Sequence, residues 1–244
     1  MIFEKNGIKI AHFIFTRWNY PQFKGRKDVN GATILDQNWI DKRISIFEKY
    51  YVPSIVNQTN KNFTCILNFD PTSSEELLKK YEGLANTQII CTPHKEFLAK
   101  WLEENQIDLL ITTRIDNDDL IAPFFIEKIQ QKIDYSTLEL NNLLLDFTGV
   151  QYDLKTKSYS KIFTHKCDSS FLSVFSTKLD GYKTCFFAEH PQMPNFFKKQ
   201  IKISEEPAFV QLIHSSNLAN RKIHGPLNGK ELMSAKNIFE KILT

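Results

Sequence analysis

Three carboxylates stand within four residues of the sequence, in the segment Asp116-Asn117-Asp118-Asp119. The apolar run over 108–113, just before them, predicts a buried strand. In an open parallel sheet, ligands bind beyond the carboxyl ends of the strands, which is where these acids would lie. Carboxylates this close repel one another unless a cation lies among them, and oxygen ligands suit hard divalent ions. We therefore expect a Mn²⁺ or Mg²⁺ ion that bridges to phosphate oxygens.

The alternative is an acidic turn that only caps the helix after it, because a bare Asp-x-Asp occurs by chance in many proteins. The position at a strand end favours the functional interpretation. The chain has only 8 Gly residues, and it contains neither a Walker-type loop nor a dinucleotide-binding Gly fingerprint. A fold that binds a nucleoside diphosphate without such a loop must neutralise the phosphates with a metal ion and side chains.

Only five of the 31 basic residues are Arg, whose planar guanidinium group forms paired hydrogen bonds to phosphate oxygens. Arg17 and Arg114 end predicted strands, and Arg221 lies near the C-terminus. Each of the three either pairs with a diphosphate or serves as an ion-pair partner within the fold. Arg43 lies in a predicted helix, where we expect a structural ion pair.

The elements that would position these residues alternate between strands and helices. Short apolar runs predict strands over 8–15, 63–69, 88–91 and 108–113. Apolar residues at three- and four-residue steps predict helices over 39–56, 94–105 and 122–133. Thr72 to Glu75 has the form of a capping box, which predicts a helix from there through Tyr81. Such alternation is typical of parallel βαβ units and therefore of an α/β fold.

The rhythm changes after about residue 140. Residues 143–152 and 159–164 predict a strand pair, and residues 171–214 mix short apolar runs with three Pro. The tail over 230–243 predicts an amphipathic helix, for which docking on the domain is the first interpretation and contact with a membrane the second. The Phe-rich stretch over 186–197 belongs either to the core or to an acceptor-facing surface, and we expect core.

Composition and charge exclude several classes of protein. The chain is 42% hydrophobic and 13% aromatic, which excludes a disordered chain. Its 31 basic and 28 acidic residues give a net charge of +3, too small for binding nucleic acid by bulk charge. The N-terminus lacks the pattern of a secretory signal, and the four Cys show no metal or redox spacing. We expect a cytoplasmic protein with buried free thiols.

Several separated segments resemble, in the same order, the putative rhamnosyltransferase family of bacterial surface-polysaccharide clusters. The resembling segments are Phe15-Thr16-Arg17-Trp18-Asn19, Trp39-Ile40-Asp41-Lys42-Arg43, Phe47-Glu48, Pro53-Ser54 with Gln58-Thr59, Phe69-Asp70 with Thr72, residues 112–119, Phe171-Leu172-Ser173, His190 and residues 210–221. The chain departs from the family pattern at Phe209, where Trp is expected, at Ser170, where Pro is expected, and in its long first loop. These departures concern the acceptor side more than the acidic cluster.

The resemblance implies a GT-A fold, Rossmann-like, as a single domain with a mixed, mostly parallel central sheet. Within 1–244 we then predict a nucleotide-sugar-binding half (1–135), an acceptor half (136–228) and a C-terminal amphipathic helix (229–244). The family moves a sugar from a nucleoside diphosphate donor to a saccharide acceptor, and its name suggests rhamnose. The acceptor would belong to a capsule or lipopolysaccharide, on a lipid carrier at the inner face of the membrane.

Roles for single residues follow from the resemblance. The implied metal ligands are Asp118, Asp116 and His214. The implied donor-binding residues are Thr16, Arg17, Asp70, Arg114, Asp116, His190, Asn217 and Arg221. For an inverting transfer we expect Glu206, of the pair Glu205 and Glu206, to be the general base, with Glu189 and Asp168 as rivals; a retaining transfer would need no such base. Asp119 would orient the acids or the donor sugar.

Each role has a structural alternative. His214 could be a core histidine, and Asp70 could serve only the turn before Pro71. Two other functions also compete: a nucleotidyltransferase that makes a nucleotide-sugar, and a non-catalytic sugar- or nucleotide-binding module of the same fold. The missing Gly-rich loop argues against the first, and the intact acids with His214 argue against the second.

Overall fold

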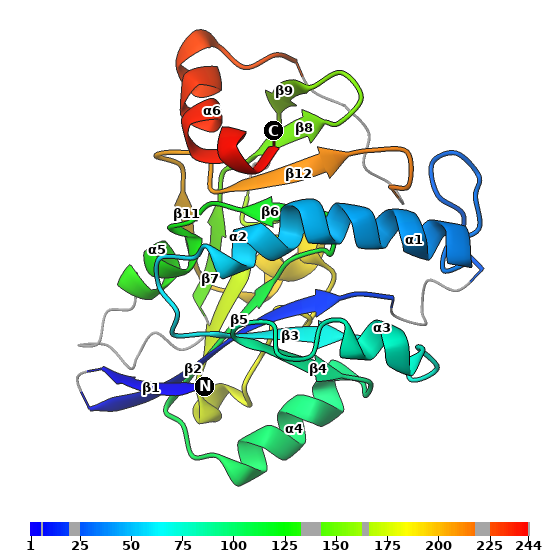
Figure 1. Cartoon of the computed structure of the whole chain (residues 1–244). Helices are drawn as coiled ribbons and strands as arrows, with labels where there is room; N and C mark the ends of the chain where they lie inside the picture. Colours follow the sequence, from blue (N-terminus) through cyan, green and yellow to red (C-terminus); the bar gives the residue numbers. More distant parts are fainter. Residues whose placement is uncertain (6, 20–24, 133–142, 163–165, 218–224, 244) are drawn as a thin grey trace.

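A computed structural model of the chain describes residues 1–5, 7–19, 25–132, 143–162, 166–217 and 225–243. Its main sheet has eight strands in the order β11-β7-β10-β5-β2-β3-β4, with β1 beside β2 (Figure 1). The strands are β1 (Ile2–Lys5), β2 (Ile8–Arg17), β3 (Thr64–Asn68), β4 (Thr87–Ile90), β5 (Leu109–Arg114), β7 (Leu143–Phe147), β10 (Ser173–Ser176) and β11 (Lys199–Ile203). Only β1 and β10 run antiparallel to their neighbours. The predicted α/β class with a mixed, mostly parallel sheet is confirmed.

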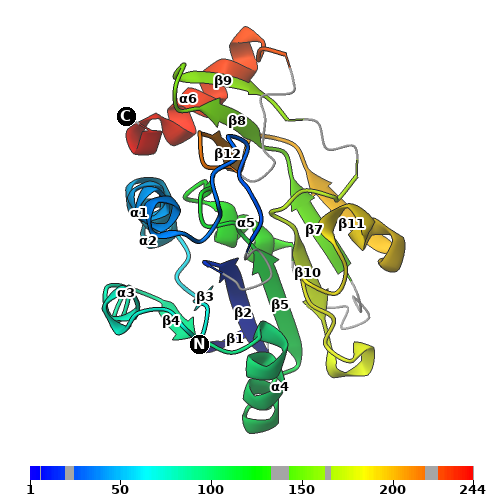
Figure 2. The ribbon, with the colours of Figure 1, turned by 90° about the vertical axis from the view of Figure 1, so that its right-hand side faces the viewer.

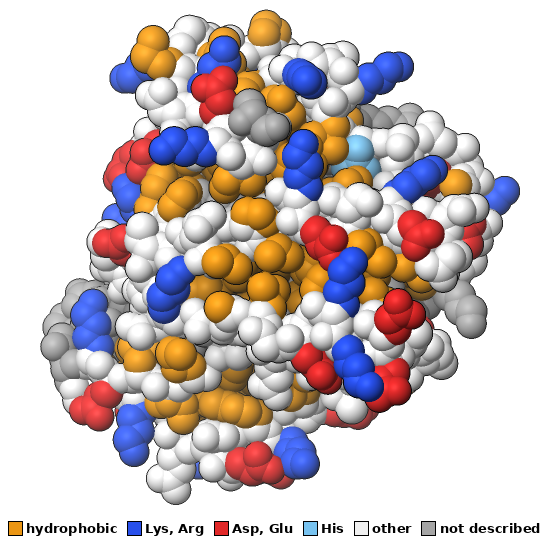
Figure 3. Space-filling view, viewed as in Figure 1, with side chains coloured by type: hydrophobic (Ala, Val, Ile, Leu, Met, Phe, Trp, Pro, Cys, Tyr) orange, Lys and Arg blue, Asp and Glu red, His pale blue; other side chains and the backbone are white. Residues whose placement is uncertain are grey.

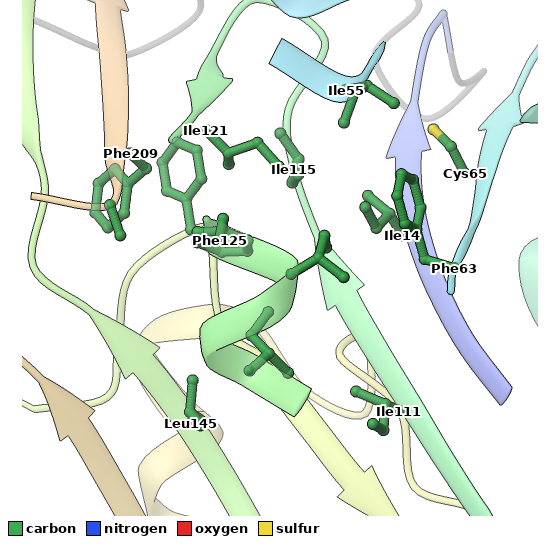
Figure 4. Packing of buried hydrophobic residues seen from close by; sticks show 14 of the residues in the cluster. Ile14, Ile55, Phe63, Cys65, Ile111, Ile115, Ile121, Phe125, Leu145 and Phe209 are labelled. Carbon is green, nitrogen blue, oxygen red and sulfur yellow. The ribbon is translucent and has the colours of Figure 1, made fainter. Parts of the chain in front are cut away.

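The central strands are apolar throughout because both faces of the sheet are covered. On β2, Ile14 points to the face packed by helices α2 and α5, while Phe13 points to the face packed by α4. Figure 4 shows the first face, where Ile14, Ile111 and Phe125 meet in one cluster. A strand buried on both sides has no polar alternation, which explains the continuous apolar runs in the sequence.

One long helix follows the first loop. It consists of α1 (Gln37–Ile46), the π-helical turn η2 (Phe47–Tyr51) and α2 (Val52–Val56). It begins two residues before the predicted helix because the Asp36 carboxylate caps it, accepting a 2.8 Å hydrogen bond from the Trp39 amide. The prediction over 39–56 is otherwise confirmed. Helix α4 (His94–Glu104) matches its predicted range within one residue.

Two helix predictions need correction. Helix α3 (Glu75–Lys79) is capped by Ser74, whose hydroxyl accepts from the Leu77 amide, and not by Thr72. Thr72 instead donates its hydroxyl to the Asp70 carboxylate. Helix α5 (Phe125–Gln131) begins three residues later than predicted, because the Ala122 amide donates to the Ala208 carbonyl and Pro123-Phe124 form a turn after the short strand β6 (Leu120–Ile121).

A second sheet, with the order β6-β12-β8-β9, lies above the first (Figure 1). It contains β8 (Val150–Asp153), β9 (Ser158–Lys161) and β12 (Phe209–Ile213). The predicted strand over 143–152 is therefore wrong as one element: it divides into β7 of the main sheet and β8 of the small one. The break falls at Gly149, where a Cβ would come within 2.2 Å of the Phe209 ring. Only Gly allows the chain to cross between the sheets there.

The C-terminal helix α6 (Gly229–Leu243) docks on the small sheet, as Figure 2 shows from the side. Its buried residues Ala235, Phe239 and Leu243 pack against Val210 and Leu212 of β12. The docked interpretation of the tail is thus confirmed. None of the described helices is long and apolar enough to cross a membrane.

The Phe-rich stretch divides between core and surface. Two short 3₁₀ turns, η3 (Lys178–Asp180) and η4 (His190–Phe196), lie in this part of the chain. Phe197 is buried, but Phe187 and Phe196 are 47% and 48% exposed, so the core prediction holds only in part. The four Cys are free thiols, and all except Cys91 are buried, as expected.

A buried histidine joins the main sheet to helix α5. His12 is fully buried on β2, and its Nδ1 accepts a 3.1 Å hydrogen bond from the Gln130 amide. The remaining proton on Nε2 then points at the Thr113 hydroxyl, 2.9 Å away. Burial lowers the pKa of His12 from 6.5 to about 3, so the folded chain holds this ring neutral.

We expect His12 to make the fold sensitive to acid. Between pH 6.5 and about 3 the unfolded chain binds a proton at this site and the folded chain does not. Stability is therefore lost as the pH falls through this window, by up to about 1.4 kcal/mol per pH unit. Urea unfolding at several pH values should show a flatter profile for His12→Gln than for the wild-type chain. Identical slopes would contradict this assignment.

Candidate functional site

The carboxyl ends of the parallel strands gather polar residues at one edge of the main sheet. β2 ends at Arg17 and β5 ends at Arg114, and the two strands are paired side by side. Asp70 follows the neighbouring strand β3, and Asp116 follows β5. The structure therefore brings four of the predicted site residues to one edge, as expected for a parallel sheet.

Asp118 lies at the centre of a buried polar cluster. Its Oδ2 atom forms a close ion pair with Nη1 of Arg43 and lies 3.1 Å from both Nε2 of His214 and Nδ2 of Asn217. The side chains of Arg43, Asp118 and His214 are only 3%, 10% and 5% exposed. Burial raises the pKa of Asp118, but the charge of Arg43 and the hydrogen bond from His214 outweigh it and hold that pKa well below 3.8.

The cluster joins three segments that are far apart in the sequence. Arg43 comes from α1, Asp118 from the loop after β5, and His214 and Asn217 from the turn after β12. Arg43 also donates to the Ser216 carbonyl at 2.9 Å, with its guanidinium 4.5 Å from the Trp39 ring centroid. The structural ion pair predicted for Arg43 is thereby confirmed, and its partner is the central acid of the acidic segment.

Asp119 points away from this edge, toward β12. Its side chain is fully buried, and its Oδ1 atom accepts a 2.9 Å hydrogen bond from the Leu212 amide. Burial, with the nearby Asp118 and Asp116 charges, raises its pKa well above the ordinary value. Asp119 thus ties the acidic segment to the strand that precedes His214.

A pair of arginines lies beside Asp116, whose side chain is 34% exposed. The guanidinium carbons of Arg17 and Arg114 lie 5.2 and 5.9 Å from the centroid of the Phe186 ring. Arg114 pairs with Asp116 at 3.2 Å, and the exposed Glu189 interacts electrostatically with both arginines. Burial and the neighbouring Arg114 charge lower the pKa of Arg17. Two adjacent guanidinium groups favour an anion, and their forked geometry suits phosphate oxygens.

The residues predicted as metal ligands do not fit a metal ion in this arrangement. The 3.1 Å between Asp118 Oδ2 and His214 Nε2 would suit neighbouring ligands of an octahedral ion. However, the Ser216 backbone amide donates to Nδ1 of His214, and an amide can only donate. With that bond made, the ring proton is on Nε2, where it faces the Asp118 carboxylate.

The acids are also already paired with arginines. Arg43 occupies the same Asp118 oxygen that faces His214, and Asp116 is bound by Arg114. Within the described part of the chain, no group of three His, Cys, Asp or Glu side chains is placed to hold a metal ion. In this arrangement the acids meet arginine side chains, and the metal site stays a prediction from the sequence.

A cavity of about 800 Å³ opens beside this edge, between α1 and α3. Figure 3 shows this part of the surface as apolar side chains bordered by charged ones. Asn19 and Asp70 line its inner end, and the Asn19 Oδ1 atom accepts from the Asp70 amide at 2.8 Å. The Asp70 carboxylate accepts from the Thr72 amide, so its turn role is confirmed. The same carboxylate still lines the cavity.

Other predicted residues lie elsewhere. Thr16 is fully buried and bonded to the Tyr51 hydroxyl at 2.5 Å, which argues against contact with a donor. Glu206 pairs with Lys128 before the start of β12, whereas His214 follows the end of that strand, so the structure does not bring Glu206 to the acids. His190 is half-buried, with Nδ1 2.7 Å from the Asp168 carbonyl oxygen. Arg221 lies outside the described residues.

Two contributors were missed by sequence reasoning. Phe186 provides the ring beside both arginines, but nothing in a Phe-rich stretch distinguishes it from core. Asp146 is buried in β7 and accepts from the Ser169 amide at 3.0 Å, which fixes the turn before β10 beside Arg114. A lone acid in the apolar strand 143–147 was the available signal for this residue.

Comparisons with known proteins gave one family match and several weak structural likenesses. A family model described as "Putative rhamnosyl transferase" matches residues 15–226. No curated protein matches the chain. S. aureus TarS 1–349 in complex with UDP-GlcNAc is 10% identical with a TM-score of 0.48, over 85% of this chain and 60% of that one. A cytidylyltransferase from Leptospira borgpetersenii is 12% identical with a TM-score of 0.41, over 89% and 82%.

The chain spans only 60% of the length of the TarS fragment. A structural likeness this weak carries no argument about ligand or reaction. The family match, which covers most of the chain, is the finding on which a functional assignment can rest.

We expect Asp119 to be needed for the position of β12. Asp119→Ala removes the acceptor of the buried Leu212 amide, which should lower the free energy of unfolding by about 1–3 kcal/mol. Asp119→Asn has the same side-chain shape and keeps an acceptor oxygen, so its free energy of unfolding should fall clearly less. Urea unfolding of the two variants beside the wild-type chain measures the difference. Equal stability of all three would show that this bond does not hold the strand.

Proposed function

The chain belongs to the putative rhamnosyl transferase family, and we propose that it is a glycosyltransferase that moves a sugar from a nucleoside diphosphate donor to a saccharide acceptor. The family match carries this proposal, and the paired arginines at the strand ends support it. The family's name points to rhamnose as the sugar. We further propose that the acceptor is a glycan of a bacterial capsule or lipopolysaccharide, held on a lipid carrier.

The charges at the edge suggest how the donor divides between two places. The cavity carries Asp36, Asp41, Asp70 and Glu76, while its Lys80 is already paired with Glu48. This surplus of acids repels phosphates but accepts an uncharged nucleoside, which Asn19 and Asp70 can bind through hydrogen bonds. The diphosphate would then lie over Arg17 and Arg114, with Asp116 within reach of the ribose.

Sugar transfer releases the nucleoside diphosphate, so negative charge develops on its leaving phosphate. Arg17 and Arg114 are held in place before the reaction by Phe186 and Asp116, and fixed cations stabilise such a transition state without reorganisation. An inverting transfer also needs a base for the acceptor hydroxyl. Glu189 is the exposed acid coupled to both arginines, and we propose it for this role in place of Glu206.

The decisive assay measures turnover with a panel of nucleoside diphosphate sugars. The purified chain is incubated with each donor and with bacterial surface oligosaccharides, and release of the nucleoside diphosphate is followed. Acceptor-dependent release with at least one donor supports the proposal. Formation of a nucleotide-sugar from a nucleoside triphosphate and a sugar phosphate would instead favour a nucleotidyltransferase.

The arginine pair should determine affinity for the diphosphate. Arg17→Gln and Arg114→Gln each remove charge-assisted hydrogen bonds, which should weaken nucleoside diphosphate binding by about 10- to 100-fold. Binding of the bare nucleoside should change little, because it would lie in the cavity. Calorimetric titration measures both, and Arg26→Gln, in the first loop, is the matched control. Unchanged diphosphate affinity in both variants would refute this placement.

The general base can be tested by two isosteric changes. Glu189→Gln removes the proton acceptor beside the arginines and should lower kcat by about 100-fold or more, with little change in donor affinity. Glu206→Gln removes one surface ion pair, that with Lys128, and should leave kcat within about 2-fold. The opposite ranking would restore Glu206 as the base.

A further inference from the structure

The buried ion pair in the candidate site points to a property beyond the transfer reaction itself. We propose that Arg43 supplies, from within the chain, the positive charge that a divalent ion would supply at Asp118, so that donor binding at this edge needs no metal ion. This inference rests on the proposed function, since it concerns how the nucleoside diphosphate is held.

The first argument is the charge that Asp118 requires. A buried carboxylate is stable only beside a cation or several hydrogen-bond donors, because removing it from water is costly. A guanidinium group stays protonated at every physiological pH, so Arg43 provides that cation permanently. With Arg43 in contact, the carboxylate has no uncompensated charge left to attract a divalent ion.

The second argument is that Arg43 is fixed in its place. Its guanidinium group stacks on Trp39 and donates to the Ser216 carbonyl, and the side chain is only 3% exposed. Moving it away to expose Asp118 would break the contacts that tie α1 to the turn after β12. The Arg43 side chain is therefore held in one position by its contacts, and it would not move aside to let a metal ion reach Asp118.

The third argument concerns the remaining donors. The Ser216 amide sets the tautomer of His214, so that its Nε2–H points at Asp118, and the Asn217 amide donates to the same oxygen. An ion at this atom would face two N–H groups and a guanidinium, all of which repel it. The positive charge proposed to bind the diphosphate then remains that of Arg17 and of Arg114, which also pairs with Asp116.

Binding measurements with the metal as the variable test this inference directly. The whole chain is treated with EDTA, and UDP, GDP and dTDP are titrated into it with EDTA or with excess MnCl₂. The affinity for the preferred nucleotide should agree within about 2-fold in the two conditions. Electron paramagnetic resonance should show Mn²⁺ remaining free in the presence of the protein, with and without that nucleotide.

Two outcomes would overturn the inference. Loss of nucleotide binding in EDTA, with recovery in Mn²⁺ and a bound Mn²⁺ signal, would refute it while leaving the proposed function intact. Failure of every nucleotide to bind in both conditions would refute the donor site itself, and with it both proposals.

A double-mutant cycle tests the partner assignment apart from binding. Arg43→Met and Asp118→Asn each leave one buried charge or donor uncompensated, and each should lower the unfolding midpoint. The double variant should lose less stability than the two single variants together. Arg43→Lys should lose less stability than Arg43→Met. Mn²⁺ should raise the midpoint of Arg43→Met, whose carboxylate is then available, but not that of the wild-type chain.

If Arg43→Met does not fold, recovery of folding in the double variant, together with the stability of Arg43→Lys, replaces the cycle as the test. Strictly additive losses of stability would show that Arg43 is not the counter-charge of Asp118. A rise of the wild-type unfolding midpoint in Mn²⁺, absent in Asp118→Asn, would show that Asp118 binds a metal ion.

Discussion

The contact between Arg43 and Asp118 is the interaction on which the rest of the site depends. It is buried, and it connects helix α1 to the loop that follows the central strand β5. Through Ser216, the same guanidinium also holds the turn after β12, from the C-terminal part of the chain. A single charge pair thereby fixes three segments against one another. Since neither partner tolerates burial alone, the pair also enforces their correct assembly.

The electrostatics of the sheet edge follow from this arrangement. Asp118 is neutralised internally by Arg43, burial raises the pKa of Asp119, and Asp116 is bound by Arg114. Three neighbouring acids, which would otherwise repel an anion, thus leave Arg17 and Arg114 to determine what binds there. The acidic cavity beside Asp70 has the opposite preference. The edge consequently presents two adjoining environments, one suited to phosphates and one suited to an uncharged, hydrogen-bonding group.

Much of the fold was predictable because local patterns agree with it. The buried strands of the first half and the long helix from Asp36 follow directly from apolar runs and helical spacing. The second half was less predictable, since one apolar run from 143 to 152 serves two sheets. Only packing reveals the reason, which is the contact of Gly149 with the Phe209 ring. The capping error at Thr72 has a similar origin, because Ser74 and Thr72 offer equivalent hydroxyls and the turn at Asp70 decides between them.

For the site, the sequence by itself determined which side chains are available and that Arg17, Arg114 and the acids stand at strand ends. A strand ends at a definite residue, and parallel strands end at a common edge of the sheet. The location of these residues at that edge can therefore be predicted from the sequence alone. Tertiary structure alone decided the partners. Whether Asp118 meets a metal ion or Arg43 depends on a helix 75 residues earlier in the sequence, and its contact with His214 depends on a turn 96 residues later. Charge and hydrogen bonding are set by distance in space, and no spacing along the chain records it.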